Sequence, residues 1–469
     1  MFKKTFFFAV CLYGSQVFSA LLFSANAQTP FVDIRPKNAD KNAVNISLSG
    51  NLSNFNYSTI PTFSKAEHLK ISAAAGLNLD SLFIYSAKLS SLKELDITGS
   101  YFGALPNSIG LLTQIEILNL SNNSNSPFAD MKLRKLPDGI AKLNIRELDL
   151  SENDVLDSAT IFTQIAKLSK LESLKMQLCE LKAIAPILGT TSSIKVLDFS
   201  GNSLTTLPAE IGNLVNLQKL DVARNFITIL PTTFSNLQQL ESLNLEQNKL
   251  PDFPLSIASL KKLHYLNLNE NILINLPANI GELTELTELR LNNFFFNNFN
   301  QKIKTLPASI TKLSKLQVLT LQDNVIEQLP ENIGSLSNLQ HLDLRDNLLS
   351  TLPQSFCQLT NLHYLDVKAN EMISLPSCLS KLVNLEDLTL AYNPKVQSAY
   401  YVEIVKELSH LKFVDISYNG ITKEQLQPVM TANPNLKVVN LGFGKKTNVE
   451  QVKSTGEEFW NSAPPERKK

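Results

Sequence analysis

The chain lacks an excess of either charge: 43 lysines and arginines balance 43 aspartates and glutamates among its 469 residues. A balanced charge gives no electrostatic reason to expect binding to nucleic acid or to an anionic membrane surface. Cysteine is also scarce, because four residues in a chain of this length cannot form the dense disulfide framework of small secreted domains. The hydrophobic content of 43% nevertheless excludes a wholly disordered chain.

Long hydrophobic runs are absent beyond the N-terminus, where no segment reaches about 18 uninterrupted apolar residues. We therefore expect no membrane span in the mature chain. The first residues differ, because Lys3 and Lys4 precede an apolar stretch and Ala25-Asn26-Ala27 fits a small-x-small cleavage site. Residues 1–27 are predicted to be a signal peptide, so that the chain is exported and is secreted, periplasmic or exposed at the cell surface. An uncleaved anchor is the alternative, because the apolar stretch is nearly long enough to span a bilayer.

Catalytic and metal-binding signatures are missing as well. The sequence contains no G-x-x-x-x-G-K-[ST] phosphate loop, no H-E-x-x-H zinc motif and no G-x-S-x-G nucleophile elbow. The five histidines lack the close spacing that fixes metal-ligand geometry. We predict that the chain is not an enzyme and has no catalytic residue, metal or cofactor.

What the chain does contain is a repeat, L-x-x-L-x-L-x-x-N, found along most of its length. When the first apolar residue is position 1, ten of the sixteen spacings between successive repeats are 23 residues. Repeats begin at residues 43, 66, 92, 115, 145, 171, 194, 217, 240, 263, 286, 316, 339, 362, 385, 411 and 436. Positions 4 and 6 alternate with positions 3, 5 and 7, which predicts a short strand with its leucines on one face.

One such strand cannot bury its leucines alone, whereas stacked repeats form a parallel sheet over a continuous core. The pattern and its period resemble the leucine-rich repeat family over about residues 43–444. The resemblance implies an α/β fold: a right-handed βα leucine-rich-repeat solenoid, or curved horseshoe, with a parallel β-sheet on the concave face.

The second half of a typical repeat reads x-L-x-x-L-P-x-x-I-x-x-L, as in Leu207-Pro208…Ile211…Leu214. Because proline removes an amide donor and fixes φ, we expect extended or 3₁₀ turns on this convex side. This version of the repeat is similar to the repeats of Ras-suppressor and Scribble-type proteins. The resemblance implies protein binding and not catalysis. Those relatives are mostly intracellular, so their partners are not carried over to a chain with an export signal.

Repeats longer than 23 residues predict where the convex side becomes helical and where insertions extend from the solenoid. Those from 66, 145 and 385 have 26 residues and lack Leu-Pro, and stretches such as 159–166 and 400–405 favour helices on the convex side. Those from 115 and 286 carry seven extra residues, 124–130 and 294–300, which we expect on one edge of the solenoid. We predict an N-terminal cap at 28–42, about 17 repeats at 43–443 and a polar tail at 444–469.

Two columns of polar residues follow from the repeat. An amide at position 9 offers two donors and an acceptor to backbone groups of the turn, and Cys179 replaces it in one repeat. We predict this structural Asn turn at Asn123, Asn153, Asn202, Asn225, Asn248, Asn271, Asn324, Asn347, Asn370, Asn393 and Asn419. Position 5 is acidic or amide, as is usual for the family, and we interpret most of its members as structural and solvent-facing. They are Asp96, Asn119, Asp149, Asp198, Asp221, Asn244, Asn267, Asp343, Asp366, Asp415 and Asn440.

The candidate binding surface is a region of mixed chemistry on the concave face of residues 263–384. Aromatic and arginine side chains on a rigid frame are typical anchors of interfaces. The candidates are His264, Tyr265, Asn267, Arg290, His341, Asp343, Arg345, His363, Tyr364, Asp366 and Lys368. Phe294, Phe295 and Phe296 join them, because three exposed rings would form an apolar patch, although burial of two of them is the alternative. The later aromatic residues, which we expect to cover the last strand, are Tyr392, Phe413, Tyr418 and Phe443.

Three cysteines remain after the leader removes Cys11. Cys357 and Cys378 occupy nearly the same phase of neighbouring repeats, so one disulfide between them is conceivable in an exported chain. Their small number favours the interpretation that they are small buried hydrophobic residues. The sequence leaves their pairing open.

These observations predict a non-catalytic scaffold that binds another protein through its concave surface. A cell-surface adhesin or glycan-binding module is the alternative, with the same aromatic rings stacking on sugars. A hydrolase that uses the acidic column is a third hypothesis, disfavoured because an open sheet supplies no closed pocket. The identity of the partner and the oligomeric state stay open.

Overall fold

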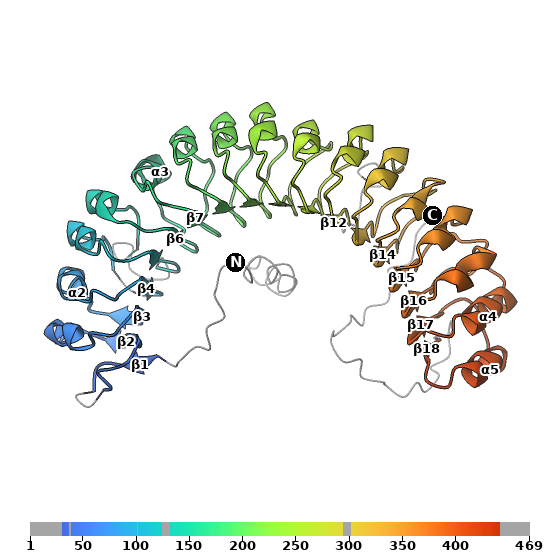
Figure 1. The fold of residues 1–469 in the computed structure, drawn as a ribbon, viewed down its shortest axis with the longest axis horizontal. Helices are drawn as coiled ribbons and strands as arrows, with labels where there is room; N and C mark the ends of the chain where they lie inside the picture. The colour runs from blue at the N-terminus through green and yellow to red at the C-terminus, as the bar shows by residue number, and fades with distance from the viewer. Residues whose placement is uncertain (1–30, 37–38, 101, 124–131, 294–301, 441–469) are drawn as a thin grey trace, which may run out of the picture. The chain divides into compact units, whose positions relative to one another are not determined.

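Short strands and helical turns alternate along the chain, and this computed structural model describes residues 31–36, 39–100, 102–123, 132–293 and 302–440. The chain divides into two compact units, residues 1–271 (unit 1) and 272–469 (unit 2). Within each unit the strands line one side and the 3₁₀ and α-helices line the other (Figure 1). The strands of a unit lie closer together than its helices, so each sheet is concave (Figure 1). We call the surface of a sheet that points away from the core its open face.

Unit 1 contains eleven parallel strands among its described residues, and each strand pairs with the next along the chain. They are β1 (Val32–Asp33), β2 (Asn45–Asn51), β3 (His68–Ala75), β4 (Glu94–Thr98), β5 (Ile117–Asn119), β6 (Glu147–Asp149), β7 (Ser173–Lys175), β8 (Val196–Asp198), β9 (Lys219–Asp221), β10 (Ser242–Asn244) and β11 (Tyr265–Asn267). Strand β1 lies before the first repeat and adds an edge strand to β2.

The other layer of unit 1 is made mostly of single 3₁₀ turns. These are η1 (Tyr57–Thr62), η2 (Asn107–Leu111), η4 (Asp138–Lys142), η5 (Pro186–Thr190), η6 (Ala209–Asn213), η7 (Thr232–Asn236) and η8 (Leu255–Ser259). The repeats from 66 and 145 carry α-helices instead, α2 (Leu79–Ser86) and α3 (Ser158–Ile165). The side chains of Asn78 and Asp157 accept backbone N–H bonds at the N-termini of these helices, as N-cap residues do.

Unit 2 repeats this plan with seven parallel strands among its described residues. They are β12 (Glu288–Arg290), β13 (Val318–Thr320), β14 (His341–Asp343), β15 (Tyr364–Asp366), β16 (Asp387–Thr389), β17 (Phe413–Asp415) and β18 (Lys437–Val439). The opposite layer contains η9 (Ala278–Glu282), η11 (Ala308–Lys312), η12 (Ile333–Ser335), η13 (Gln354–Gln358), η14 (Ser377–Lys381), α4 (Ser398–Glu407) and α5 (Lys423–Ala432). The spacing did not predict α5, which begins at a capping box formed by Thr422 and Gln425.

The core of each unit lies between the two layers and is built from the repeat's apolar positions. Leu342 of β14 and Leu344, which follows the strand, are fully buried. Ile333 of η12 is fully buried too and packs into the core from the opposite layer. Burial of one such side chain is worth about 1.5–3 kcal/mol. Because every repeat supplies the same positions, the core is continuous along a unit.

Proline starts most of the 3₁₀ turns, as predicted from the Leu-Pro pairs. Pro208 precedes η6 in an extended conformation, and its carbonyl accepts the N–H of Ile211 at 3.1 Å. The glycine that follows is required by the close approach of the next turn. A Cβ on Gly212 would lie 2.2 Å from the carbonyl oxygen of Thr233 in η7.

The last repeat departs from the predicted register. Val439, not Asn440, lies opposite Asp415 in the pairing of β17 and β18. The Asn440 amide instead donates to the carbonyl of Ile421 at 2.8 Å. The assignment of Asn440 to position 5 is therefore wrong, because β18 pairs one residue out of step with the repeat.

The predicted signal peptide and polar tail, and both predicted insertions with Phe294, Phe295 and Phe296, lie outside the described residues. Within the described part of the chain, no helix is both long enough and apolar enough to cross a membrane.

Candidate binding face

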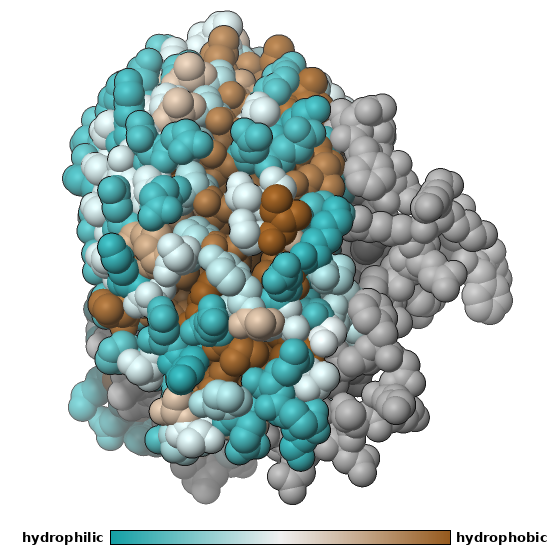
Figure 2. All heavy atoms as spheres, turned by 90° about the vertical axis from the view of Figure 1, so that its right-hand side faces the viewer, coloured by the Kyte–Doolittle hydropathy of each residue, from teal (hydrophilic) through white to brown (hydrophobic). Residues whose placement is uncertain are grey.

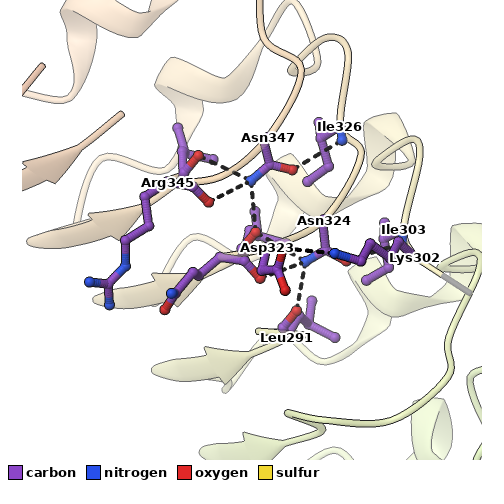
Figure 3. Close-up of polar contacts among 11 residues, drawn as sticks. Leu291, Lys302, Ile303, Asp323, Asn324, Ile326, Arg345 and Asn347 are labelled. Atoms are coloured by element: carbon purple, nitrogen blue, oxygen red, sulfur yellow. Dashed lines mark hydrogen bonds and ion pairs between the residues drawn. The ribbon is translucent and has the colours of Figure 1, made fainter. Parts of the chain in front are cut away.

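The asparagines at position 9 link each repeat to the one before it. The amide of Asn347, which is labelled in Figure 3, donates to the carbonyls of Leu321, Leu344 and Arg345 at 2.9, 3.0 and 3.2 Å. Its oxygen accepts the N–H of Ile326, which belongs to the preceding repeat, at 3.0 Å. One buried side chain thus satisfies backbone groups that would otherwise lack partners.

This pattern recurs with the same geometry in both units. Asn225 donates to the carbonyls of Phe199 and Val222, and its oxygen accepts the N–H of Leu204. In the repeat from 171, Cys179 keeps one of these bonds, because its thiol donates to the carbonyl of Leu150 at 3.2 Å. Burial raises the pKa of the Cys179 thiol to about 12, so it stays a protonated donor. These residues hold the turn and belong to the frame.

The residue before each of these asparagines adopts the left-handed conformation. Asp323 and Asp346 in unit 2 have φ of +55° and +54°, and Arg224 in unit 1 has φ of +55°. An L-residue pays a conformational cost of about 1–2 kcal/mol there. The interlocking amide bonds of the next residue hold the turn in this shape.

The acidic residues of position 5 are more buried than predicted. Asp198, Asp221, Asp343 and Asp366 are 5, 7, 3 and 4% exposed. The interpretation of these four as solvent-facing is wrong, because they lie on adjacent strands and neighbouring side chains contact them. Gln177 and Asn244 bond the unit 1 pair. In the unit 2 pair, Arg345 contacts Asp343 and Tyr364 contacts Asp366.

Two of these aspartates hold their protons unusually tightly. Burial, and then the neighbouring carboxylate of Asp198, raise the pKa of Asp221 to about 7. Burial and the carboxylate of Asp343 raise the pKa of Asp366 to about 7 in the same way. Partners in each pair lie opposite each other on adjacent strands, about 4.8 Å apart. Two carboxylates at that distance cannot both ionise without strong repulsion.

In unit 2 the structure brings His341 and Tyr364 together at the centre of the open face. Their rings stack with centroids 4.1 Å apart and planes 4° apart. Burial, followed by the charges of Arg290 and Arg345, lowers the pKa of His341 to about 4. Burial and the nearby carboxylates raise the pKa of Tyr364. The stack therefore carries no charge near neutral pH.

Arg345 and Lys368 flank this stack on the C-terminal side of the strands. The guanidinium of Arg345 pairs with Asp343 at 3.0 Å and keeps 27% of its side chain exposed. The hydroxyl of Tyr364 donates to Asp366 at 3.3 Å, and the Lys368 ammonium lies 5.5 Å from the ring centre of Tyr392. Five predicted candidates, His341, Asp343, Arg345, Tyr364 and Asp366, thus form one contact network.

Other predicted residues of unit 2 also make contacts of their own. Arg290 forms an ion pair with Glu288 on its own strand. His363 is exposed, and its Nδ1 lies 2.8 Å from the carbonyl of Asn361. Tyr392 and Tyr418 form a second stacked pair, with centroids 4.1 Å apart.

In unit 1 three predicted residues lie on or beside β11. His264 is exposed and Tyr265 is half-buried. Asn267 is 2% exposed, donates to Glu246 at 3.2 Å and accepts the N–H of Asn269 at 3.0 Å. Asn267 is therefore a structural residue of the sheet more than a contact residue.

Sequence reasoning missed two residues of the open face, Thr320 and Gln322. Thr320 is 8% exposed, and its hydroxyl has no hydrogen-bond partner. The Oε1 atom of Gln322 and the Nε atom of Arg345 are likewise buried and unpartnered. One signal was available, because Thr320 replaces the usual acidic or amide residue of position 5. The loss of hydrogen-bond partners has no signature in the sequence.

The residues next to the second insertion are held by a buried ion pair. Lys302 is 8% exposed, and its ammonium lies 2.7 Å from Oδ1 of Asp323, as Figure 3 shows. The N–H of Ile303 donates to Asn324 at 3.0 Å. After the first insertion Lys132 lies 3.6 Å from Asp154. A lysine thus fastens the chain where each insertion rejoins its repeat.

Cys357 of η13 and Cys378 of η14 form a disulfide, with Cα atoms 5.8 Å apart. The interpretation of this pair as two reduced hydrophobic residues is wrong, because stacking of the two turns places them side by side. Among the described residues, no three His, Cys, Asp or Glu side chains lie close enough together to hold a metal ion.

On the described surface away from the sheet, we find no comparable cluster of aromatic and arginine side chains. Seen from the side of the C-terminal helices, hydrophilic residues surround narrower hydrophobic strips (Figure 2). Exposed apolar residues of unit 2 include Ile373 and Val383 in the repeat from 362 and Met430 in the repeat from 411. The open face of unit 2 therefore carries the densest network of anchor-type side chains.

Curated proteins give no match to this chain. Among solved structures, it is similar to a leucine-rich repeat protein of Leptospira interrogans, with 26% identity and a TM-score of 0.72 over 85% of this chain and 96% of that one. A plant peptide hormone receptor in complex with RGF2 shares 24% identity and a TM-score of 0.59, over 85% of this chain and 66% of the receptor. Drosophila Toll, in its complex with Spatzle, shares 19% identity and a TM-score of 0.65, over 81% of this chain and 51% of that one. The likeness to the receptor and to Toll shows the fold alone.

The sequence model of the leucine-rich repeat region matches residues 182–321 and 307–441. Together these cover residues 182–441, which is 260 of the 469 residues and more than half of the chain. The parallel strands, the 3₁₀ turns and the linked asparagines are the structural counterpart of this match. The chain belongs to the leucine-rich repeat family.

Proposed function

We propose that this chain is an exported, non-catalytic scaffold that binds another protein through the open face of its sheet. The observation that carries the proposal is the network of His341 in β14, Tyr364 in β15 and Arg345, which follows β14 by two residues. Aromatic and arginine side chains on a rigid frame dominate the binding energy of protein interfaces. The frame is rigid here because each repeat is bonded to the next through buried amides.

Two further observations support the proposal. The Cys357–Cys378 disulfide fits export, because disulfides persist in oxidising compartments outside the cytosol. The plant receptor is seen in complex with RGF2, and Toll is seen in complex with Spatzle. A long open sheet also suits contact with a macromolecule better than enclosure of a small substrate.

The test uses a partner captured by cross-linking from the secreted or envelope fraction and then purified. Replacing His341, Arg345 and Tyr364 together with alanine should weaken its binding at least a hundredfold, because each anchor typically contributes 1 kcal/mol or more. The matched control replaces Lys304 and Glu327, an exposed ion pair away from the open face, and should leave the affinity unchanged. Equal affinity for both variants would place the interface elsewhere. Binding of the purified chain to a glycan array, with no protein partner, would favour the adhesin alternative.

A further inference from the structure

Three polar atoms on the open face of unit 2 are buried and have no hydrogen-bond partner among the described residues. They are the hydroxyl of Thr320, Oε1 of Gln322 and Nε of Arg345. An unmade hydrogen bond at a buried polar group costs about 1–3 kcal/mol. A ligand that supplies the missing hydrogen bonds would recover part of that cost as binding free energy. These atoms therefore indicate where on the open face a ligand would bind.

The three residues lie on or directly after two neighbouring strands. Thr320 in β13 is directly opposite Asp343 in β14. Gln322 and Arg345 follow these residues by two positions each, so they extend from the same face about one strand spacing, ~4.8 Å, apart. The stacked rings of His341 and Tyr364 border this group. We call Thr320, Gln322, Arg345, His341 and Tyr364 the β13–β15 site.

The charges around the β13–β15 site disfavour a charged ligand group. An anion would meet the negative charge that Asp343 and Asp366 share, and a cation would meet Arg345 and Lys368. The stacked rings are uncharged near neutral pH, because burial keeps His341 from taking a proton. The group that fits is therefore neutral and polar, with both a donor and an acceptor.

We propose that the β13–β15 site binds an extended, uncharged segment of a partner polypeptide through the backbone N–H and C=O of one of its residues. The partner's N–H donates to Oε1 of Gln322, and its C=O accepts from Nε–H of Arg345 and from the hydroxyl of Thr320. The neighbouring side chain of the segment packs on the rings of His341 and Tyr364. This inference rests on the proposed protein-binding function and adds the class of segment that is recognised.

The backbone N–H and C=O of one extended residue match the unpartnered atoms in number and kind. In an extended chain the N–H and C=O of one residue point to the same edge, and successive side chains point to opposite faces. Backbone bonds then provide affinity, and the side chain on the ring stack provides specificity. Gln322 and Arg345 are half-buried side chains, so rotation about their outer bonds can turn the atoms toward a segment. Neither Oε1 of Gln322 nor Nε of Arg345 gives up a hydrogen bond of its own when it moves, although rotation of Arg345 loosens its ion pair with Asp343.

The test begins with a displayed library of short linear peptides selected against the full-length chain. Thr320→Val and Gln322→Leu remove the unpartnered oxygens and keep side-chain volume nearly constant. Both variants should bind the selected peptides at least tenfold more weakly, and Thr320→Val should fold with unchanged or higher stability, because it removes a buried, unpartnered hydroxyl. Thr389→Val is the matched control: it makes the same change at the same strand position of β16 and should leave affinity unchanged.

A second measurement identifies the bond itself. Methylating each peptide amide in turn should reveal one nitrogen whose methylation lowers affinity at least tenfold for the natural chain. The same methylation should have little further effect on Gln322→Leu, because the bond is already absent there. Such coupling is not expected if Gln322 acts only by supporting the fold.

Each other outcome overturns the inference. Peptides that bind the natural chain, Thr320→Val and Gln322→Leu with equal affinity would place recognition elsewhere and leave the proposed function standing. If the chain binds glycans on an array and selects no peptide from the library, the inference of a peptide ligand is refuted and the adhesin alternative is favoured. If neither class binds, the inference fails, and the proposed function is decided separately by the captured partner and the triple alanine variant.

Discussion

At the scale of the residue, the most demanding position of the repeat is the asparagine at position 9. Asn347 bonds three carbonyls and one N–H, and it is 2% exposed. Only a side chain with two donors and an acceptor at this length can serve both its own turn and the preceding repeat. Cys179 can replace only part of this role, because its thiol donates to the carbonyl of Leu150 but it has no amide oxygen to accept a bond from the preceding repeat.

Replacing Asn347 with alanine should therefore lower the free energy of unfolding by about 3 kcal/mol, since it orphans the N–H of Ile326 and removes bonds to buried carbonyls. Urea denaturation followed by circular dichroism measures the loss. Asn338→Ala is the control, because exposed Asn338 makes one bond to Ser314 and its replacement should cost less than about 1 kcal/mol. Equal losses would mean that the buried amide is not needed.

The pair Asp343 and Asp366 predicts a dependence of stability on pH. The pKa of Asp366 is raised to about 7, mainly by burial and then by Asp343, while an unfolded aspartate titrates near about 4. The folded chain thus binds a proton that the unfolded chain has released, so stability falls as pH rises between about 4 and about 7. Backbone N–H of Lys368 and the charges of Arg345 and Lys368 act in the opposite direction but do not overcome burial.

Asp366→Asn should abolish this part of the dependence. The free energy of unfolding of the natural chain should fall on the order of 2–3 kcal/mol more than that of Asp366→Asn between pH 5 and pH 8. Denaturation midpoints at both pH values give the comparison. Glu386→Gln provides the control, because Glu386 is paired with Lys412 at the surface and its pKa is lowered. The same pH trend in Asp366→Asn and the natural chain would refute the assignment.

At the scale of the element, the stacked 3₁₀ turns depend on close approach between repeats. Gly212 in η6 has no room for a side chain beside η7. Turns η13 and η14 are joined covalently as well, by the disulfide between Cys357 and Cys378. The disulfide closes a loop with a sequence separation of 21 residues.

Loss of this disulfide should lower stability by about 3 kcal/mol, because a loop of this length gains that much freedom in the unfolded chain. Replacing both Cys357 and Cys378 with serine should shift the urea midpoint downward. A reducing agent should shift the natural chain to the midpoint of the double variant and leave that variant unchanged. A reducing agent with no effect on the natural chain would show that the cysteines are not bonded in solution.

At the scale of the whole molecule, stability is a sum over neighbouring repeats, because each described repeat contacts mainly the ones before and after it. Within unit 1, Asn225 bonds Leu204 of the preceding repeat, and Asn248 bonds Ile227 in the same way. Successive repeats therefore have interchangeable interfaces.

Deletion of residues 217–239, one full period, should leave a folded chain in which Asn248 takes the place of Asn225 beside Leu204. Circular dichroism and cooperative unfolding would report the retained fold, with a modest loss of stability. Deletion of residues 217–227 should unfold the neighbouring repeats, because it puts their leucines and asparagines out of phase. A chain that tolerates both deletions equally would contradict the nearest-neighbour description.

Much of this architecture could be predicted from the sequence, because the period and the apolar pattern act locally. The alternation at positions 3–7 predicts a strand, and the Leu-Pro pair predicts a 3₁₀ turn. A period of 23 residues then stacks each position on the equivalent position of the next repeat. The position of Asn347 and the helical repeats with α2, α3 and α4 follow from the same pattern.

Only the tertiary structure decided which side chains meet across repeats. The burial of Asp366, the contact of Cys357 with Cys378 and the unpartnered hydroxyl of Thr320 each depend on residues 20 or more positions away. The shift of Val439 into the place expected for Asn440 depends on pairing with β17. A single repeat specifies its own fold, whereas desolvation and hydrogen-bond supply at a surface are set by the side chains of two or three strands together. That is why the sequence determined the scaffold and the stacking of repeats decided the site.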